Sequence, residues 1–174
     1  VINGLRRLEY RGYDSAGIVL DSENSEFVVA KTKGKVDDLV AISKDLSGKA
    51  NVGMGHTRWA THGVPSDRNS HPHVSNNRKI ALVHNGIIEN YDTIKIMLTE
   101  KGFTFQSETD TEILVNLIQY FMDSNSEIDF PAAVRFALNE VYGAYAITVM
   151  HDDFPGVLVV ARLGSPLAIG LGEK

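Results

Sequence analysis

Apolar residues recur along the chain with two different spacings, which predict helices and strands. Apolar positions three or four residues apart, as on one face of a helix, predict helices at 1–10, 36–46, 91–101, 109–122 and 131–141. Apolar runs bounded by turn residues predict strands at 16–20, 26–32, 51–59, 80–84, 144–150, 157–161 and 166–169. Helices and clustered strands without a regular strand–helix–strand alternation predict an α+β fold with antiparallel sheet.

The helix at 109–122 has the clearest start signal. Thr109 and Glu112 form a Thr-x-x-Glu capping box, in which each side chain caps a backbone N–H of the other residue. By contrast, the segment 60–77 is polar and rich in Gly, Pro and His, and it is too long for a simple connector. We therefore expect 60–77 to be a functional loop.

The composition limits the classes of function. A length of 174 residues predicts one domain. With 17 Lys and Arg against 22 Asp and Glu, the net charge of −5 argues against a nucleic-acid or anionic-membrane surface. No apolar run approaches the ~18 residues that span a bilayer, and no signal-peptide pattern leads the chain. Without cysteine there is no disulfide framework, and we expect a cytoplasmic protein with no nucleic-acid or membrane partner.

Two charged residues could together bind a free amino acid. Arg58 ends a predicted strand, and its planar guanidinium could hold a carboxylate through two parallel hydrogen bonds. Asp110 lies in the first turn of a predicted helix, where it would be a rigid acceptor for an ammonium group. The alternatives are a surface ion pair for Arg58 and a simple helix-terminus role for Asp110.

The dipeptide Asn85-Gly86 lies between two apolar runs and has two interpretations. Asn-Gly in this position is the strongest short-range signal for a hairpin turn, so we expect a turn here. An asparagine amide and the following backbone N–H can also converge on one oxygen as an oxyanion hole, and glycine lets a substrate approach the backbone closely. The two interpretations are compatible.

Histidines gather in one part of the chain, where five of the six fall between positions 56 and 84. His71-Pro72-His73 has a spacing that metal sites use, so a zinc hydrolase with His62, His71 and His73 is an alternative. No His-Glu-x-x-His motif and no cysteine accompanies them. Trp59, the single tryptophan, opens the polar loop and could act as a lid or gate, although a lone tryptophan is more often part of a core.

Several of these motifs together resemble the class II glutamine amidotransferases. They lie, in order, at 8–17, 56–63, 71–73, 84–90 and 107–112. Within that class the set is similar to the glutaminase domains of glucosamine-6-phosphate synthases over almost the whole chain. The resemblance implies an N-terminal-nucleophile hydrolase fold, a four-layer αββα sandwich of two antiparallel sheets. It also implies hydrolysis of L-glutamine, with ammonia passing to an isomerase domain that aminates fructose 6-phosphate.

The resemblance assigns roles to particular residues. Asn85 and Gly86 would form the oxyanion hole, and Arg11 and Gly12 would lie near the nucleophile. The remaining site residues would bind or enclose glutamine: Arg58 its carboxylate, Asp110 its ammonium, Thr61 and His62 as pocket lining, Trp59 as a gate on the ammonia path, and His71 on a loop that orders over the substrate. The resemblance implies no metal and no cofactor.

The resemblance also implies a nucleophile that this sequence does not contain. The family uses an N-terminal cysteine whose α-amino group serves as general base, whereas this chain begins at Val1 and has no cysteine. We expect residues 1–174 to be a glutaminase domain lacking its cysteine strand and its C-terminal end, without the isomerase domains and inactive alone. The full-length protein would be a homodimer. A non-catalytic glutamine-binding module remains the alternative.

Overall fold

The computed structural model describes residues 1–21, 27–44, 46 and 50–172, and its strands form two sheets. The first sheet has three strands in the order β2-β1-β3, formed by β1 (Ser15–Leu20), β2 (Val28–Lys33) and β3 (Gly53–Arg58). The second has four in the order β4-β5-β6-β7, formed by β4 (His73–Val74), β5 (Ile80–Ile88), β6 (Gly143–His151) and β7 (Leu158–Leu163). Every pairing between these strands is antiparallel.

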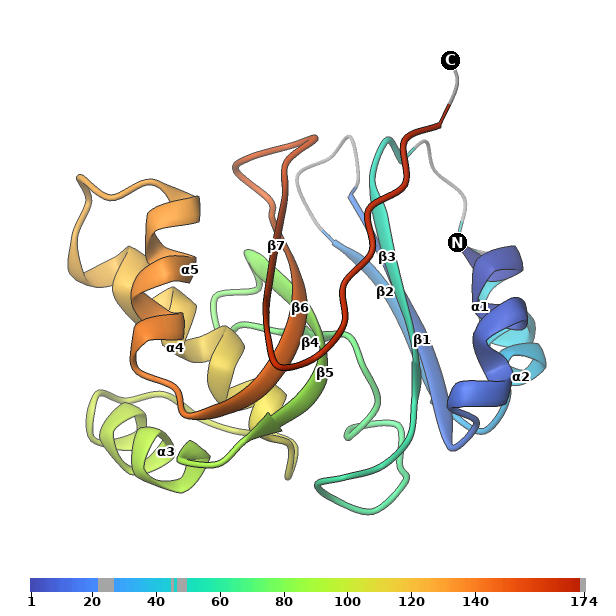
Figure 1. Ribbon diagram of the computed structural model, residues 1–174, viewed down its shortest axis with the longest axis horizontal. Helices are drawn as coiled ribbons and strands as arrows, with labels where there is room; N and C mark the ends of the chain where they lie inside the picture. Colours follow the sequence, from blue (N-terminus) through green and yellow to red (C-terminus); the bar gives the residue numbers. More distant parts are fainter. Residues whose placement is uncertain (22–26, 45, 47–49, 173–174) are drawn as a thin grey trace.

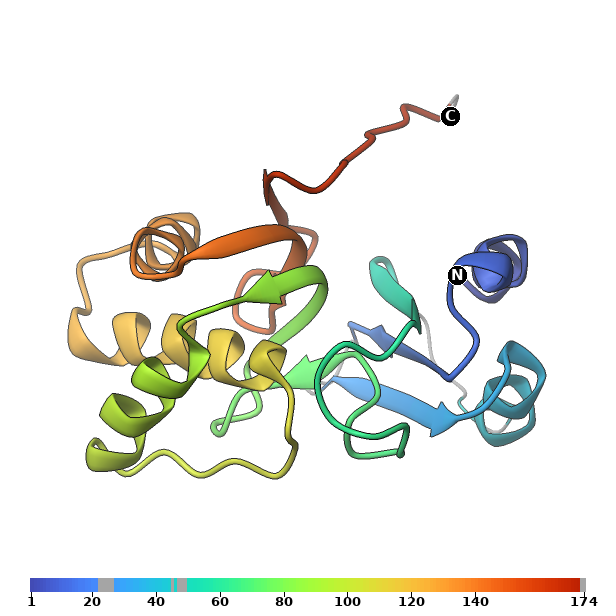
Figure 2. The ribbon, with the colours of Figure 1, turned by 60° about the horizontal axis from the view of Figure 1, so that its bottom comes forward.

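Helices cover the outer face of each sheet (Figures 1 and 2). Helices α1 (Ile2–Leu8) and α2 (Val36–Ser43) lie on the first sheet, and a 3₁₀ turn, η1 (Glu9–Arg11), follows α1. Helices α3 (Tyr91–Glu100), α4 (Asp110–Ser124) and α5 (Phe130–Asn139) lie on the second. The layers therefore run helix, sheet, sheet, helix, which confirms the predicted αββα sandwich. No helix within the described ranges is both long and apolar enough to cross a membrane.

The central strands β1 and β5 carry apolar residues on both faces because each is covered on both sides. On β1, Ile18 packs with residues of α1 and α2, whereas Val19 points the opposite way, into the layer between the sheets. On β5, Leu82 packs toward α3, α4 and α5, and Val83 joins Val19 in the layer between the sheets. This double burial explains why the sequence shows continuous apolar runs in place of strict alternation.

The prediction of a turn at Asn85-Gly86 is wrong. Strand β5 continues unbroken to Ile88, and Asn85 and Gly86 pair with Ala146 and Tyr145 of β6. Gly86 has a φ of 143°, a conformation that favours glycine, and a Cβ there would overlap the carbonyl oxygen of Ala144. The glycine is therefore required by close backbone packing within the sheet and not by a chain reversal.

Two further expectations need correction. Residues 166–169 form no strand: after Gly164 the described chain runs extended and exposed, with Leu171 96% exposed, so its alternating apolar residues find no pairing partner.

The capping box of α4 is only half formed. Thr109 Oγ1 accepts from the Glu112 N–H at 3.3 Å, but the Glu112 carboxylate accepts from the Ser107 N–H and hydroxyl, both at 2.6 Å. The remaining predicted helices and strands are present with shifted ends; Glu26 and Asp45, at or near two of those ends, lie outside the described residues.

Candidate active site

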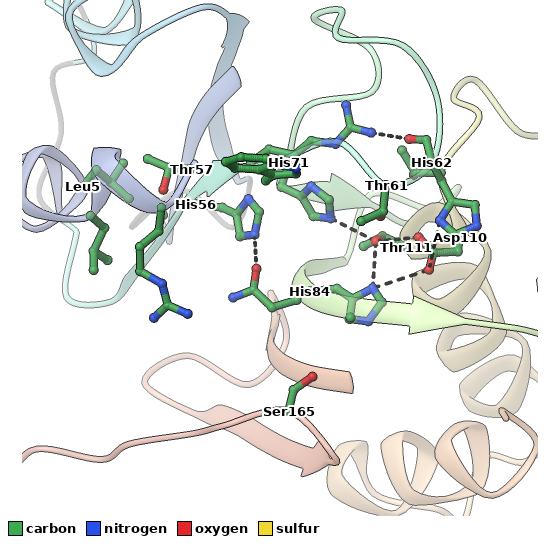
Figure 3. Close-up of a pocket in the computed structure, with 18 of the residues that line it drawn as sticks. Leu5, His56, Thr57, Thr61, His62, His71, His84, Asp110, Thr111 and Ser165 are labelled. Atoms are coloured by element: carbon green, nitrogen blue, oxygen red, sulfur yellow. Dashed lines mark hydrogen bonds and ion pairs between the residues drawn. The ribbon is translucent and has the colours of Figure 1, made fainter. Parts of the chain in front are cut away.

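A cavity of about 480 Å³ lies where the two sheets meet the start of α4 (Figure 3). All the predicted site residues except Gly12 line it: Arg11, Arg58, Trp59, Thr61, His62, His71, Asn85, Gly86 and Asp110. Gly12 lies behind the wall, where a Cβ would come within 2.8 Å of the backbone of Thr57 and Arg58. Residues far apart in the sequence thus converge on one cavity.

Arg58, the last residue of β3, is 4% exposed. Its Nη2 donates to the carbonyl oxygens of His62 and Gly63, the latter at 3.1 Å, and so shapes the loop after β3. Its Nη1 makes no hydrogen bond within the described part of the chain and lies 3.9 Å from Asp14 Oδ1. Burial lowers the pKa of this guanidinium while Asp14 and Asp110 raise it, and arginine remains a cation.

Asp14 supports Arg58 and the start of the loop, a role that the sequence analysis missed. Its Oδ1 accepts from the Ser15 hydroxyl at 2.7 Å, and its Oδ2 accepts from the Ala60 N–H. Asp14 lies within the motif at 8–17. The motif gave the only available signal, because nothing local reveals a bond to Ala60, which is 46 positions away.

Asp110 is buried at the first position of α4, where the helix dipole favours a negative charge. Its Oδ2 accepts from the Ile88 N–H at 2.9 Å. The Nδ1 atoms of His62 and His84 each lie 3.9 Å from the same oxygen. The carboxylate is therefore fixed in place, with neighbouring imidazoles outside hydrogen-bond distance.

Asn85 and Gly86 reach the cavity from β5. The Oδ1 of Asn85 lies 2.9 Å from Nε2 of His56, which belongs to the other sheet. Trp59 lies at the rim, 64% exposed, with its ring edge-on to Tyr13 at a centroid distance of 5.6 Å. The exposure of Trp59 excludes the core position that was the alternative for this residue.

Buried histidines form a connected cluster beside the cavity. The rings of His56 and His71 lie 4.3 Å apart, and those of His71 and His73 lie 5.0 Å apart. The Thr111 hydroxyl bonds to His71 Nε2 at 2.9 Å and to His84 Nδ1 at 3.1 Å. Burial lowers the pKa of His56 from 6.5 to about 4 and moves those of His71 and His73 well below 6.5. These imidazoles are therefore neutral at neutral pH.

The cluster does not support the zinc alternative. Among the described residues, no three His, Cys, Asp or Glu side chains are arranged so that they could hold a metal ion. The Nε2 atoms of His71 and His73 are instead bonded to the hydroxyls of Thr111 and Thr109, the latter at 3.0 Å. The histidine spacing reflects packing and hydrogen bonding against α4.

Lys31 of β2 holds the loop that carries His71, a second feature that sequence reasoning missed. Its Nζ donates to the carbonyl oxygens of Ser70 at 2.8 Å, Pro72 at 3.2 Å and Arg68 at 3.4 Å. Burial lowers the pKa of Lys31 from 10.5 to about 8, against the attraction of nearby carboxylates, so the ammonium keeps its three donors at neutral pH. No short motif marks such a lysine.

Unpaired nitrogens show where a polar ligand is needed. Within the described residues, every buried side-chain nitrogen or oxygen without a hydrogen bond belongs to a cavity-lining residue: His56 Nδ1, Arg58 Nη1, His62 Nδ1, His71 Nδ1 and His84 Nε2. A buried polar group left unpaired costs about 1–3 kcal/mol. The concentration of such groups here indicates that the cavity is built to bind a polar molecule.

Comparison with known proteins identifies the family. The family described as "Glutamine amidotransferase domain" matches residues 41–164, most of the chain. The chain belongs to the glutamine amidotransferase domain family. Glutamine–fructose-6-phosphate aminotransferases (isomerizing) of Bacteroides thetaiotaomicron and Chlorobaculum tepidum are 54% and 50% identical to this amidotransferase domain over 99% of its length. The amidotransferase domain covers 28% of each of those relatives.

Solved structures agree with this family and with the fold. The glutamine phosphoribosylpyrophosphate amidotransferase of B. subtilis is 28% identical, with a TM-score of 0.75 over 92% of this amidotransferase domain and 33% of its own chain. A class-II glutamine aminotransferase domain protein of Silicibacter pomeroyi shares the fold. It is 16% identical, with a TM-score of 0.56 over 88% of this domain and 70% of its own chain. The N-terminal-nucleophile hydrolase fold implied by the sequence motifs is therefore confirmed.

Proposed function

We propose that this chain is the glutaminase part of a glutamine–fructose-6-phosphate aminotransferase (isomerizing), the name its relatives carry. It hydrolyses the side-chain amide of L-glutamine to glutamate and ammonia. The ammonia then aminates fructose 6-phosphate to glucosamine 6-phosphate in isomerase domains outside residues 1–174. Identities of 54% and 50% along almost the whole chain support this proposal, and because the chain spans 28% of those relatives, the amination step belongs to the rest of the protein.

One observation carries the glutaminase assignment. A buried guanidinium with a free N–H donor and a buried carboxylate, Arg58 and Asp110, line the same cavity. A free amino acid carries a carboxylate and an ammonium on one carbon, so the two side chains match both charges. Asn85 lies on another wall of the cavity, where it would meet the side-chain amide of the bound glutamine.

The reaction requires a nucleophile, and we place it on a cysteine outside residues 1–174, since these residues contain none. The thiolate attacks the amide carbon, the C–N bond breaks, and the protonated nitrogen leaves as ammonia. Water then cleaves the thioester, which releases glutamate and restores the thiol. Each tetrahedral intermediate carries an oxyanion, which the Asn85 amide and the Gly86 N–H would stabilise.

The other lining residues have supporting roles in this proposal. Thr61 and His62 would line the glutamine pocket beside Asp110, and His71, which is held by the Thr111 hydroxyl and carried on the loop bound by Lys31, would form part of its wall. Trp59 at the rim would gate the path of ammonia. Arg11 would lie near the incoming nucleophile, while Gly12 would act through the backbone of β3, because it lies outside the cavity lining.

A non-catalytic glutamine-binding module is the second candidate, favoured by the absence of cysteine from the 174 residues. The two candidates separate in the full-length natural protein, by calorimetry with L-glutamine and an assay for glutamate release. Binding with turnover supports the glutaminase, and binding without turnover supports the module. A protein that neither binds nor hydrolyses L-glutamine would contradict both candidates.

The same preparation tests the downstream step. When fructose 6-phosphate is added to the full-length protein with glutamine, we expect glucosamine 6-phosphate to form. The amount of free ammonia released should then be smaller than the amount of glutamate formed. We further propose that the full-length protein is a cytoplasmic homodimer with no nucleic-acid or membrane partner. Sedimentation analysis and cell fractionation test these two statements.

A further inference from the structure

Asn85 can stabilise an oxyanion only if its amide nitrogen, and not its oxygen, faces the reacting atom. Strand β4 pairs with β5 only at Ala81 and Leu82. Beyond those residues, that edge of β5 has no neighbouring strand among the described ranges. Strand pairing is made by backbone groups and does not fix which end of the Asn85 amide points into the cavity, so a side-chain contact must do so.

His56 provides that contact from the first sheet. Its Nε2 lies 2.9 Å from Asn85 Oδ1, and its ring is buried, with 7% of the residue exposed. A neutral imidazole carries one N–H, and an amide oxygen can only accept, so the proton lies on Nε2. His56 Nδ1 then carries the lone pair.

Packing fixes the ring of His56 in the orientation that this bond needs. The ring lies 4.3 Å from that of His71, at an interplanar angle of 35°. His71 is itself held by the Thr111 hydroxyl at 2.9 Å, and its carbonyl oxygen lies against Gly17, the residue paired with His56 in the first sheet. The donor is therefore preorganised before any substrate arrives.

We propose that His56 is a positioning residue: its Nε2–H binds Asn85 Oδ1 and thereby directs the amide N–H group toward the developing oxyanion. The inference rests on the proposed glutaminase function. Without the bond, Asn85 is free to present its oxygen, whose lone pairs would repel the oxyanion. His56 therefore acts on the transition state through Asn85.

The test uses the full-length protein and a pair of matched substitutions. His56→Phe keeps a flat ring against His71 but removes the donor, and it is expected to lower kcat about 10- to 100-fold with KM for glutamine within about two-fold of wild type. His56→Gln places an amide N–H near the former Nε2 and is expected to restore most of that loss. His151→Phe, which replaces a buried histidine of β6 outside the cavity lining, is the control and should leave kcat unchanged.

A double-mutant cycle identifies the route by which His56 acts. Asn85→Ala alone is expected to lower kcat about 10²–10³-fold, as for other single oxyanion donors. If His56 acts through Asn85, adding His56→Phe to Asn85→Ala changes kcat by less than about three-fold. Effects that multiply fully in the double variant contradict the proposal.

Other outcomes are equally decisive. An unchanged kcat in His56→Phe, or a loss confined to KM, overturns the positioning role while leaving the glutaminase function intact. A wild-type protein that releases no glutamate refutes the glutaminase function and this inference together. Should His56→Phe fail to fold, His56→Asn replaces it, because its shorter side chain cannot reach Asn85 and the same loss of kcat is expected.

Discussion

Asp110 Oδ2 accepts a hydrogen bond from the backbone N–H of Ile88 at 2.9 Å, two positions after Gly86 on β5. This bond ties the first turn of α4 to the strand that carries Asn85 and Gly86. The proposed ammonium site and the proposed oxyanion hole therefore belong to one rigid part of the second sheet. Arg58 reaches the cavity from the first sheet, so a bound glutamine would bridge the two layers.

Asp110→Asn tests the ammonium site. The amide can still accept from the Ile88 N–H, so the local structure is expected to persist, but the negative charge is lost. A hydrogen bond to a charged group contributes about 1.5–3 kcal/mol, so KM for glutamine should rise about 10- to 100-fold. Steady-state glutaminase kinetics of the full-length protein measure the change.

Glu108→Gln is the matched control for this substitution. Glu108 also loses its charge, two positions earlier, but its half-exposed side chain lies outside the cavity lining and faces Arg68 at 3.5 Å. The KM of the Glu108→Gln variant for glutamine should stay within about two-fold of wild type. Equal effects of the two substitutions would contradict a specific role for Asp110.

Arg58→Lys tests the carboxylate site while keeping the charge. The guanidinium donates to two loop carbonyls through Nη2 and keeps Nη1 free, and a lysine ammonium cannot reproduce this planar arrangement. We expect KM for glutamine to rise at least about ten-fold, together with a lower melting temperature. Arg68→Lys, at an exposed ion pair, should change neither quantity. An unaltered KM in Arg58→Lys would remove Arg58 from the binding site.

Gly86→Ala tests the close packing of β5 against β6. The φ of 143° and the overlap of a new Cβ with the Ala144 carbonyl oxygen would force the two strands apart. We expect a loss of more than about 2 kcal/mol in the free energy of unfolding, measured by urea denaturation. Gly102→Ala is the control: its φ of 91° is also positive, but a Cβ there meets no atom within 4 Å. A similar loss in both variants would show that backbone conformation, and not the contact with Ala144, sets the requirement.

The buried histidines predict that stability falls in acid. Burial lowers the pKa of His56 from 6.5 to about 4, so below pH 6.5 the unfolded chain binds a proton that the folded protein excludes. His71, His73, His84 and His151 have pKa values lowered in the same direction. The contribution of these neutral imidazoles to the free energy of unfolding is therefore complete above pH 6.5 and is lost as the pH falls toward 4.

Urea denaturation at pH 7.5 and pH 5 measures this effect. Between these two pH values His56 alone is expected to account for about 2 kcal/mol of the free energy of unfolding, since one pKa unit corresponds to about 1.4 kcal/mol and pH 5 lies about 1.5 units below the ordinary imidazole pKa of 6.5. Equal or greater stability at pH 5 would contradict the burial of neutral imidazoles. His151→Phe should reduce the pH dependence without affecting the cavity, because His151 lies outside its lining.

The sequence predicted what local patterns determine. The apolar stripe of α4 follows from its packing on the second sheet, and the continuous apolar runs of β1 and β5 follow from burial on both sides of each sheet. The predicted αββα layers are present. At Asn85-Gly86 the local turn preference lost to tertiary structure, because pairing with β6 demands a residue without a side chain. Sequence pattern cannot distinguish these two uses of glycine.

Long-range hydrogen bonds were beyond the reach of pattern analysis. The sequence shows His56 only as one of a group of histidines, yet it contacts Asn85, 29 positions away, and Lys31 binds the carbonyl of Ser70, 39 positions away. Such bonds depend on how the two sheets face each other and not on spacing along the chain. The motifs therefore predicted the residues that line the cavity, while the residues that hold them in place required the structure.

A crystal structure of the full-length protein with bound L-glutamine would test most directly the central claim that Arg58 and Asp110 bind the two charges of this amino acid. We predict the α-carboxylate within hydrogen-bond distance of Arg58 Nη1, the α-ammonium at Asp110, and the side-chain amide oxygen beside Asn85. Glutamine bound outside this cavity, or within it with neither charge at these two side chains, would contradict the proposed clamp.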